Sequence, residues 1–204
     1  MSSSETPSTR AYHHGALREA LVDASEALLA ERGLEGFTLR EVARRAGVSP
    51  AAPAHHFGDV RGLLTAVATR AFEELAARLT VADEAARPDR RARLRAQGEA
   101  YIRFALDRPG LFDLMFRVAK LDTSDPVFNA AGDSAFAVLE RAVSGGSSAT
   151  GPGPDSPPGA VVAWSLVHGF ARLALDGQFR REGQEDWLDA PLAAVLDAGL
   201  DRIV

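Results

Sequence analysis

Apolar residues recur every three or four positions through most of the chain, which is the spacing of one face of an α-helix. The pattern first appears in residues 15–32, and Gly33 then supplies a residue suited to end a helix. Alternation of apolar and polar residues, the mark of a β-strand, never persists for more than a few positions. The sequence therefore predicts an all-α protein. The first apolar stripe consists of Leu17, Leu21, Ala24, Leu28 and Leu29.

Capping signals predict two short helices after the first long one. Thr38 is followed three residues later by Glu41, the arrangement of a capping box, and Gly47 ends the helix that these residues begin. Ser49 followed by Pro50 then opens the second short helix, because a side-chain acceptor precedes a residue that the first helical position tolerates.

Asp59 supplies the next N-cap, and the apolar stripe that follows predicts a long helix over residues 60–80. A polar break at residues 87–89 separates this helix from the second half of the chain. Residues 144–159 are rich in Ser, Gly and Pro, and we expect them to form a mobile loop. Together with five further helices the chain is expected to hold about nine. These five are predicted over residues 89–107, 109–118, 125–143, 161–177 and 186–202.

Composition is that of an ordinary soluble protein, since 46% of the 204 residues are hydrophobic and 25% are charged. No apolar run approaches the roughly 18–20 residues that a membrane-spanning helix needs. Residues 1–9 lack the features of a secretory signal. The absence of cysteine excludes disulfides, thiol catalysis and cysteine-ligated metals. We therefore expect a cytoplasmic protein with no membrane partner, no bound metal and no cofactor.

The net charge of −5 means that any contact with nucleic acid must come from a local basic patch. Residues 37–61 hold four arginines and two acidic residues, a balance of +2. Four of the five histidines also lie in the first sixty residues, at His13, His14, His55 and His56. Adjacent histidines on a helix point about 100° apart and make a poor metal site. This bias is weak, so composition alone does not indicate DNA binding.

Residues 38–57, TLREVARRAGVSPAAPAHHF, carry the most specific pattern in the chain. Two short helices joined by a turn are typical of a helix-turn-helix, and Ala43 is small enough to let the helices cross closely. Such a pair cannot bury itself, so the helices at 15–32 and 60–80 should complete a head from which the second short helix protrudes toward a DNA major groove. An ordinary helical hairpin is the alternative. The predicted shared core is Leu39, Val42, Val48 and Phe57.

The stretches LREVARRAGVS and HHF and the Leu-Leu pair that follows resemble, residue by residue, the head of the TetR family of bacterial regulators. The resemblance covers residues 12–64. The opening YHHG and the later Trp164-Ser-Leu-Val-His168-Gly169 are similar to a branch of that family named for a Trp-His-Gly motif. Membership implies an all-α fold of nine helices, a homodimer built largely on the last two, and a ligand pocket in the C-terminal domain. It also implies repression of transcription until a small molecule binds.

We accordingly divide the chain into three parts. Residues 1–14 are expected to form a flexible arm and residues 15–60 the helix-turn-helix domain. A long helix leads from this head into residues 61–204, which are expected to form a helical bundle for ligand binding and dimerisation.

Several residues of the head are candidates for contact with a palindromic double-stranded DNA operator. Ala51, Ala52 and His55 should face base edges, although His55 can instead contact a phosphate or only solvent. Thr38 is first a helix cap, and it can also face a phosphate. For the arginines a solvated side chain is the alternative, and His56 can instead pack within the head. The remaining candidates are Arg10, Arg44, Ser49, His56 and Arg61.

Three positions depart from the family pattern. The family usually has Tyr where this chain has Ala54 and Lys where it has Val60, and both are commonly phosphate contacts, for which the neighbouring Arg61 can substitute in part. Pro53 replaces a common Leu. If the helix began at Pro50, Pro53 would lack its first backbone hydrogen bond, so the helix is expected to begin later or as a 3₁₀ turn. These departures bear on operator affinity and not on the fold.

The C-terminal half holds many aromatic residues, most of which are expected to be core. His168 lies four residues after Trp164 and is either a satisfied core histidine or a polar anchor in a pocket. No Arg or Lys shares that helix face, so we expect an apolar ligand and not a strongly anionic one. The pocket itself is implied by the resemblance. Its candidate residues are Phe104, Phe112, Met115, Phe116, Phe136, Trp164 and His168.

The last two predicted helices have wider apolar faces than one intramolecular contact covers, so we expect them to form a homodimer. No phosphate-binding loop, nucleophile elbow or carboxylate pair indicates an enzyme. The sequence therefore predicts a ligand-responsive transcriptional repressor. The alternative, favoured by Ala54 and Val60, is a dimeric protein that binds a small molecule or partner and whose DNA-binding head has weakened. The candidate dimerisation residues are Val161, Val167, Leu192, Leu196 and Leu200.

Overall fold

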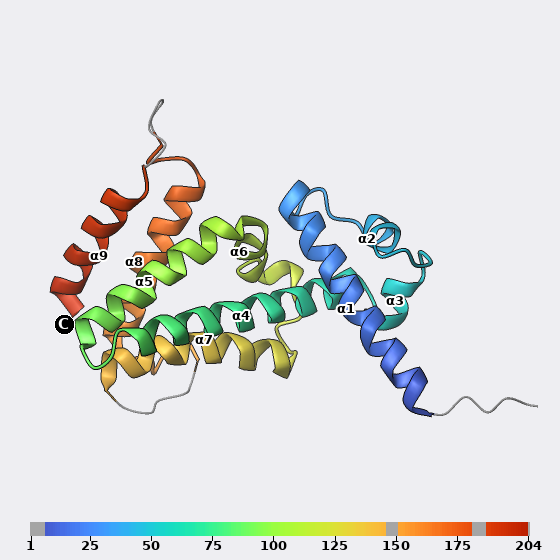
Figure 1. The fold of residues 1–204 in the computed structure, drawn as a ribbon, viewed down its shortest axis with the longest axis horizontal. Coiled ribbons are helices and arrows are strands. Elements are labelled where there is room, and N and C mark those ends of the chain that lie inside the picture. The colour runs from blue at the N-terminus through green and yellow to red at the C-terminus, as the bar shows by residue number, and fades with distance from the viewer. Residues whose placement is uncertain (1–6, 146–150, 181–186, 204) are drawn as a thin grey trace, which may run out of the picture.

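A computed structural model of the protein describes residues 7–145, 151–180 and 187–203. Within these ranges the chain forms nine α-helices, one 3₁₀ helix and no strand, so the predicted all-α fold is confirmed (Figure 1). The elements are α1 (Pro7–Arg32), α2 (Leu39–Arg45), α3 (Ala52–Phe57), α4 (Val60–Ala85), α5 (Arg90–Asp107), α6 (Pro109–Met115), η1 (Val118–Lys120), α7 (Pro126–Ser144), α8 (Pro158–Leu175) and α9 (Asp189–Ile203).

Helix α4 connects the two ends of the molecule. Figure 1 shows α1, α2 and α3 gathered into a head at one end, with α8 and α9 at the other end. The 26 residues of α4 span about 39 Å at 1.5 Å per residue. Its first turns pack in the head, and the rest of the helix lies mainly against α7 and α5. A movement of the body can therefore reach the head through one rigid element.

The N-caps predicted for α2 and α4 are both present. The side chain of Thr38 accepts the backbone N–H of Glu41 at 3.3 Å, and the carboxylate of Asp59 accepts that of Gly62 at 2.9 Å. The reciprocal half of the predicted capping box is not formed, because the Glu41 carboxylate binds the guanidinium groups of nearby arginines instead. Local sequence signals thus position both ends of the α2–α3 segment.

Helix α3 begins later than Pro50, as its prolines predict. The backbone N–H of Ala52 donates to the carbonyl of Ser49 in a turn, and the helix proper starts at Ala52. Pro53 therefore lies in the first turn, where a backbone N–H has no intrahelical acceptor, so no hydrogen bond is lost. The expectation that Ser49 caps this helix was wrong, since Ala51 is the N-cap and no side chain caps it.

Several element bounds differ from those predicted. Helix α1 begins at Pro7, so residues 7–14, assigned above to an arm, are helical. Helix α4 continues to Ala85, just before the predicted break. The single helix predicted over residues 109–118 is instead the short α6 followed by η1. Part of the predicted loop, residues 146–150, lies outside the described residues.

Helix α8 alone has the length and hydropathy of a membrane-spanning helix among the described residues, which the sequence analysis did not anticipate. One face of α8 packs in the body as a core helix against α5, α7 and α9. Its apolar character therefore comes partly from core packing. The buried residues of α8 are Ala160, Ala163, Val167, Phe170, Ala171 and Ala174.

The head and the body also touch through the segments that lie before and after η1. The N-terminus of α6 approaches the end of α1 so closely that a Cβ on Gly110 would lie 2.5 Å from the carbonyl oxygen of Leu29. Farther along, the hydroxyl of Thr65 on α4 accepts the backbone N–H of Asp122 at 2.8 Å. These contacts join the head to the two segments that flank η1.

Candidate DNA interface and ligand cavity

Helix α3 presents a short exposed face at the edge of the head (Figure 1). Ala51, Ala54 and His55 are exposed, whereas Ala52 is partly buried, so three of these four side chains share the solvent-facing side. The opposite side of α3 faces the head. There the guanidinium of Arg18 lies over the ring of Phe57, 4.9 Å from its centroid. This packing leaves the N-terminal end of α3 exposed, so that this end can enter a groove of a partner molecule.

The two histidines of α3 lie side by side. The rings of His55 and His56 are 5.4 Å apart and nearly perpendicular, and His56 is partly buried. No cluster of three metal-ligating side chains occurs among the described residues. The side chains of His13, His14 and Arg10 lie outside the described part of the structure, so the DNA contact assigned to Arg10 stays a prediction.

The arginines of the head differ in how their charge is compensated. Arg44 is exposed, and both of its hydrogen bonds go to Glu41, at 2.9 and 2.7 Å. Hydrogen bonds from Arg44 and then Arg45 lower the pKa of Glu41 to about 2. By contrast, Arg40 and Arg61 are exposed and take part in none of the salt bridges between described side chains of the head. Their charges are therefore more available to a phosphate than that of Arg44.

Arg40 was missed by the sequence reasoning. It occupies the second position of α2, directly after the capped end at Thr38. A positive charge in the first turn destabilises a helix, because the N-terminal end of the helix dipole is also positive. An anion bound at this end would compensate for that charge. That position was the available sequence signal. Val60, where the family usually has Lys, is 43% exposed, and Ala54 is also exposed, so neither departure is buried.

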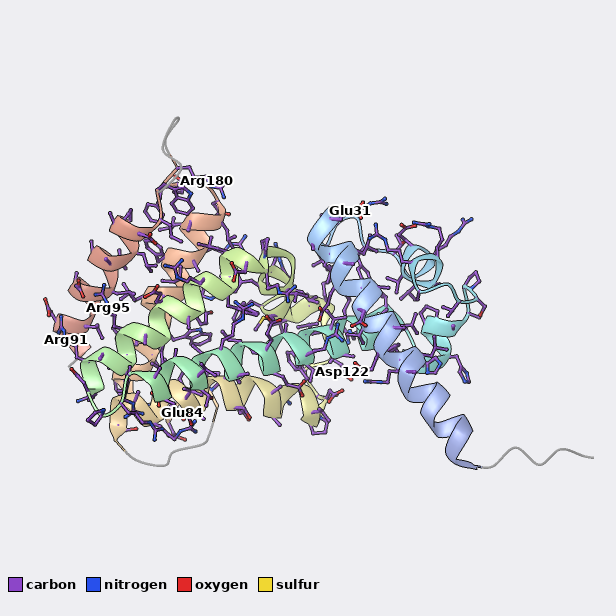
Figure 2. All side chains as sticks on the ribbon, in the orientation of Figure 1. Glu31, Glu84, Arg91, Arg95, Asp122 and Arg180 are labelled. Atoms are coloured by element: carbon purple, nitrogen blue, oxygen red, sulfur yellow. The ribbon has the colours of Figure 1, made fainter. Side chains whose placement is uncertain are left out.

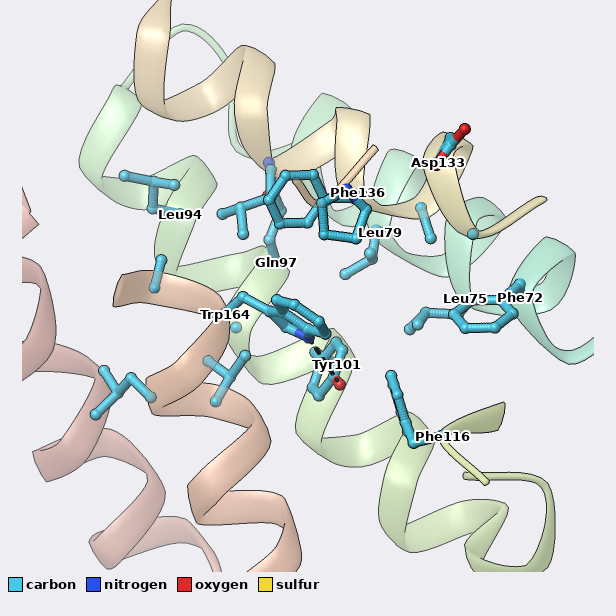
Figure 3. A pocket seen from close by; sticks show the side chains of 18 of the residues that line it. Phe72, Leu75, Leu79, Leu94, Gln97, Tyr101, Phe116, Asp133, Phe136 and Trp164 are labelled. Atoms are coloured by element: carbon cyan, nitrogen blue, oxygen red, sulfur yellow. Dashed lines mark hydrogen bonds between the residues drawn. The ribbon is translucent and has the colours of Figure 1, made fainter. Parts of the chain in front are cut away.

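The body contains a partly open cavity of about 530 Å³ bounded by α4, α5, α7, α8 and α9. This volume falls in the range of about 300–1,000 Å³ that is typical of small-molecule sites. Its wall is mostly Leu and aromatic side chains, and Figure 3 shows the labelled ones converging from the surrounding helices. Of the predicted ligand-binding residues, Phe116, Phe136 and Trp164 line it.

Phe104, Phe112, Met115 and His168, which were also predicted to bind ligand, do not line this cavity. The first three are buried in the core, and the guanidinium of Arg78 lies over the ring of Phe104. Their apolar periodicity is therefore explained by packing. Sequence spacing cannot separate a residue at a cavity wall from its neighbours in the core.

His168 lies just behind the wall. Its Nδ1 is 2.9 Å from the hydroxyl of Tyr101, which also accepts the indole N–H of Trp164 at 3.3 Å. Its ring contacts the ring of Phe116 edge-on at 4.6 Å. Burial, with a smaller effect from Arg172, lowers the pKa of His168, so the imidazole is neutral at physiological pH. The structure thus matches the alternative of a satisfied histidine that supports the wall.

Gln97 and Tyr101 were not identified from the sequence, although both are polar residues of the wall, as are Asn129 and Asp133. Gln97 and Tyr101 lie on α5, four residues apart, within a stripe that is otherwise apolar. Two polar residues at helical spacing on a buried face were the available signal. Residues of α4 were also missed as wall components, namely Phe72, Leu75 and Leu79.

Gln97 ties the cavity wall to the end of α4. Its amide nitrogen donates to Asp83 at 2.5 Å, and Arg93 donates to the same carboxylate at 2.9 and 3.0 Å. Burial favours the protonated form of Asp83, but hydrogen bonds from Arg93, Gln97 and Arg87 outweigh it and lower the pKa. The buried carboxylate is therefore charged and holds α4 and α5 together beside the cavity.

Most of the predicted dimerisation residues are already buried within one chain. Four of these residues are buried: Leu192 lies in the core, whereas Val167, Leu196 and Leu200 line the cavity. A Cβ on Gly98 would lie only 2.5 Å from Leu196. Assigning them to a surface between protomers was wrong, because these side chains do not reach the surface. Val161 is exposed, and its place in a dimer interface stays a prediction.

Other residues of α8 and α9 do face outward. On α8, Val162 is 52% exposed and Leu173 is 48% exposed. On α9 the outward positions Ala190, Ala194 and Ala198 are small. The helix is held to its own chain by α5, whose Arg91 pairs with Asp201 at 2.7 Å and whose Arg95 pairs with Asp197. Figure 2 labels both arginines at the edge of α5 that faces α9.

A three-helix head with a protruding short helix is joined by one long helix to a body with a mostly apolar cavity. This arrangement defines the class of helix-turn-helix proteins with a ligand-sized site. Two family models match the chain. The model for bacterial regulatory proteins of the tetR family matches residues 21–67, and the Tetracyclin repressor-like C-terminal domain matches residues 94–199. The chain belongs to the TetR family. The Trp-His-Gly branch stays a prediction.

Relatives agree with this assignment. The HTH-type transcriptional regulator BetI of Burkholderia ambifaria is 44% identical over 79 residues, which is 39% of this chain and 41% of BetI. The chain thus matches less than half the length of the curated relatives. A Rhodococcus sp. RHA1 protein of unknown function is 37% identical over 98% of this chain and 97% of its own, with a TM-score of 0.73. A TetR family regulator of Marinobacter aquaeolei VT8 has the same fold, with a TM-score of 0.67. It is 22% identical in sequence, and the match covers 94% of this chain and 97% of its own.

Proposed function

We propose that this protein is a dimeric transcriptional regulator that binds a palindromic double-stranded DNA operator through α3 and releases it when an apolar small molecule occupies the cavity. The observation that carries the proposal is the position of α4. Its first turn, capped by Asp59, follows α3 directly, and Phe72, Leu75 and Leu79 farther along it line the cavity. One helix therefore belongs to both sites. Such a regulator acts in the cytoplasm and needs no catalytic group or cofactor.

The proposed DNA contacts divide into two kinds. Ala51 and His55 on the exposed face of α3 read base edges, where a methyl group can pack against a thymine methyl. Thr38, Arg40 and Arg61 lie around this face and contact phosphates, which position the protein without reading sequence. Arg44 contributes less, because its guanidinium is engaged by Glu41.

Binding to a palindrome requires two heads about one helical turn of DNA, roughly 34 Å, apart. We propose that the exposed side of α8, with Val162 and Leu173, packs against the same surface of a second copy together with the small residues of α9. Val162→Glu or Leu173→Glu should then convert the dimer to monomers, and light scattering measures the change. A wild-type protein that is monomeric at micromolar concentration would contradict the dimer.

The proposed switch uses the contacts between body and head. A ligand that displaces Phe116, at the end of α6, moves an element whose other end at Gly110 touches Leu29 of the head. The ligand can lower operator affinity only if it binds better to the arrangement in which the two heads do not match the operator. Apolar ligands are favoured by the mostly apolar wall.

A weakened DNA-binding head is the second candidate function, and a specific observation favours it. Ala54 on α3 and Val60 at the start of α4 are exposed, yet neither offers a polar side-chain atom where family members usually present one. In that case the protein would bind its small molecule or partner but not distinguish operator from competitor DNA.

Selection of genomic fragments in the presence of competitor DNA separates the two functions, because only a specific binder retains fragments under competition. We expect a recurring palindrome to be selected. Arg40→Ala should then weaken binding and reduce its salt dependence, since one phosphate contact is lost. Arg141→Ala removes the same charge from an exposed position on α7 and serves as the matched control. Failure to enrich any fragment would favour the weakened head.

A further inference from the structure

The cavity wall contains a buried hydrogen-bond acceptor that no described side chain or backbone group satisfies. Gln97 lines the cavity and is only 3% exposed. Its amide nitrogen donates to Asp83 at 2.5 Å and lies 3.5 Å from the carbonyl oxygen of Val138. Its carbonyl oxygen Oε1 has no hydrogen-bond partner and is almost completely covered by neighbouring atoms, so a ligand reaches it only when wall side chains shift aside.

The orientation of this amide is determined by its partner. Asp83 is a charged carboxylate that can only accept hydrogen bonds, so the –NH₂ group of Gln97 must face it and the Oε1 must point away. The neighbouring polar groups of the wall bond to one another. The indole N–H of Trp164 donates to the hydroxyl of Tyr101, and that hydroxyl also shares a hydrogen bond with Nδ1 of His168, whose tautomer sets the donor. No hydrogen bond joins any of these groups to Gln97.

The charges on the cavity wall also bear on which ligand fits. Among the described residues that line the cavity, Asp133 alone is charged, and none is Lys or Arg. Asp133 is exposed and lies so close to Gly151 that a Cβ there would overlap its carboxylate. A carboxylate or phosphate on a ligand would therefore meet acceptors and no compensating cation, whereas a hydroxyl or N–H group would meet a partner.

We infer that the ligand is a neutral, ring-containing apolar molecule that carries a hydrogen-bond donor, and that Gln97 selects it by accepting that donor at Oε1. This inference rests on the proposed function only in taking the cavity as the ligand site. A donor on the ligand satisfies an acceptor that otherwise stays buried without a partner. A ligand of the same shape without the donor leaves that acceptor unsatisfied and binds less tightly.

A matched set of probes tests the inference by calorimetry on the full chain without DNA. The neutral donor is 2-naphthol, 2-methoxynaphthalene has the same ring without a donor, and 2-naphthoate carries an anion. We expect 2-naphthol to bind about 5- to 10-fold more tightly than 2-methoxynaphthalene, the usual effect of one buried neutral hydrogen bond. We expect 2-naphthoate to bind more weakly than either.

The variant Gln97→Met keeps the length of the side chain and removes the acceptor, and Asp83 keeps its hydrogen bonds from Arg93 and Arg87. The affinity ratio between the two neutral probes should fall to about 1 in this variant. Leu28→Met, which places the same side chain in the buried core of the head and away from the cavity, should leave the ratio as in the wild type. Both neutral probes share the naphthalene ring system, so a small change in protein stability affects their two affinities equally. The ratio of the affinities therefore does not change.

Three results would overturn the inference: a ratio near 1 in the wild type, a ratio that Gln97→Met leaves unchanged, or no binding of any probe up to about 1 mM, where affinity is already weak. Tightest binding by 2-naphthoate would overturn it as well. Since no DNA is present, these results are independent of the operator selection. Loss of DNA binding with the expected probe preference would contradict the proposed regulator and leave the role of Gln97 supported.

Discussion

The head and the body place their candidate functional residues in opposite environments. In the head, Thr38, Ala51 and His55 are exposed, and nearby caps and turns hold them in place. In the body, Gln97 and Trp164 are at least partly buried on different helices and meet only because those helices pack around one cavity. The first arrangement is local in sequence and the second is not. Mutations should therefore act on the two regions in different ways.

The largest expected effect is on the core of the body. Phe104→Ala should lower the free energy of unfolding by about 3–5 kcal/mol, because a fully buried ring leaves a hole that its neighbours cannot fill. Urea denaturation measures the change. Phe136→Ala is the control, since its ring borders an existing cavity and its loss should cost less. Equal stability of the two variants would contradict the distinction between core and cavity wall.

A second variant should strengthen the binding of the head to DNA. Ala54→Tyr combined with Val60→Lys should raise operator affinity by about 10-fold. The salt dependence should steepen by about 0.9 for each phosphate that the added Lys neutralises, whereas the neutral Tyr hydroxyl leaves it unchanged. Binding titrations at several salt concentrations measure both quantities. Val81→Lys adds the same charge to an exposed position near the far end of α4 and should have little effect. If the double variant binds no better than the wild type, the missing groups do not limit affinity.

A smaller effect is expected from a single cap. Thr38→Ala removes the acceptor for the N–H of Glu41 and should lower the stability by about 1 kcal/mol. Thr80→Ala is a matched control, because the Thr80 hydroxyl bonds only to the carbonyl of Ala76 within the same helix. Thermal unfolding compares the two. A cost for Thr80→Ala as large as that for Thr38→Ala would mean that the cap is not what stabilises α2.

The smallest effects concern pH, and they separate the two regions. Burial lowers the pKa of His168, so its contribution to stability is present above the ordinary histidine value of about 6.5 and is lost as the pH falls through its folded pKa. Glu41, with a pKa of about 2, contributes above the ordinary Glu pKa and loses its contribution only in stronger acid. The body should therefore respond to mild acid before the head does.

Urea unfolding of the wild type and of His168→Gln at pH 8 and pH 5.5, values set around the ordinary histidine pKa of about 6.5, tests this order. The variant should lose less stability than the wild type between the two values. Glu41→Gln should behave as the wild type in this range. The same pH dependence in wild type and His168→Gln would exclude His168 as the group responsible.

Much of the head could be predicted because its signals are local. Thr38 and Asp59 cap the helices that they precede, and Gly47 adopts the positive φ of 68° that the turn between α2 and α3 requires. The late start of α3 follows from Pro50 and Pro53 in the same way. Backbone hydrogen bonds over three or four residues decide these features, and the sequence states which residues can make them.

The errors have a common origin as well. Ser49 has a side chain suited to a cap, but the chain turns through its carbonyl and leaves the cap position to Ala51. Leu192, Leu196 and Leu200 form an apolar stripe that can face either a partner or the chain's own core. A stripe indicates that a helix buries one face, and it does not say against what.

By itself the sequence determined the all-α fold, the position of the helix-turn-helix and the apolar character of the body. Only the tertiary structure decided which aromatic residues border the cavity, that Gln97 lies among them, and that the Leu stripe of α9 is internal. Helix periodicity and capping arise from contacts between residues close in the chain. The cavity arises from the packing of helices distant in the chain, where displacement by one residue exchanges a wall position for a core position.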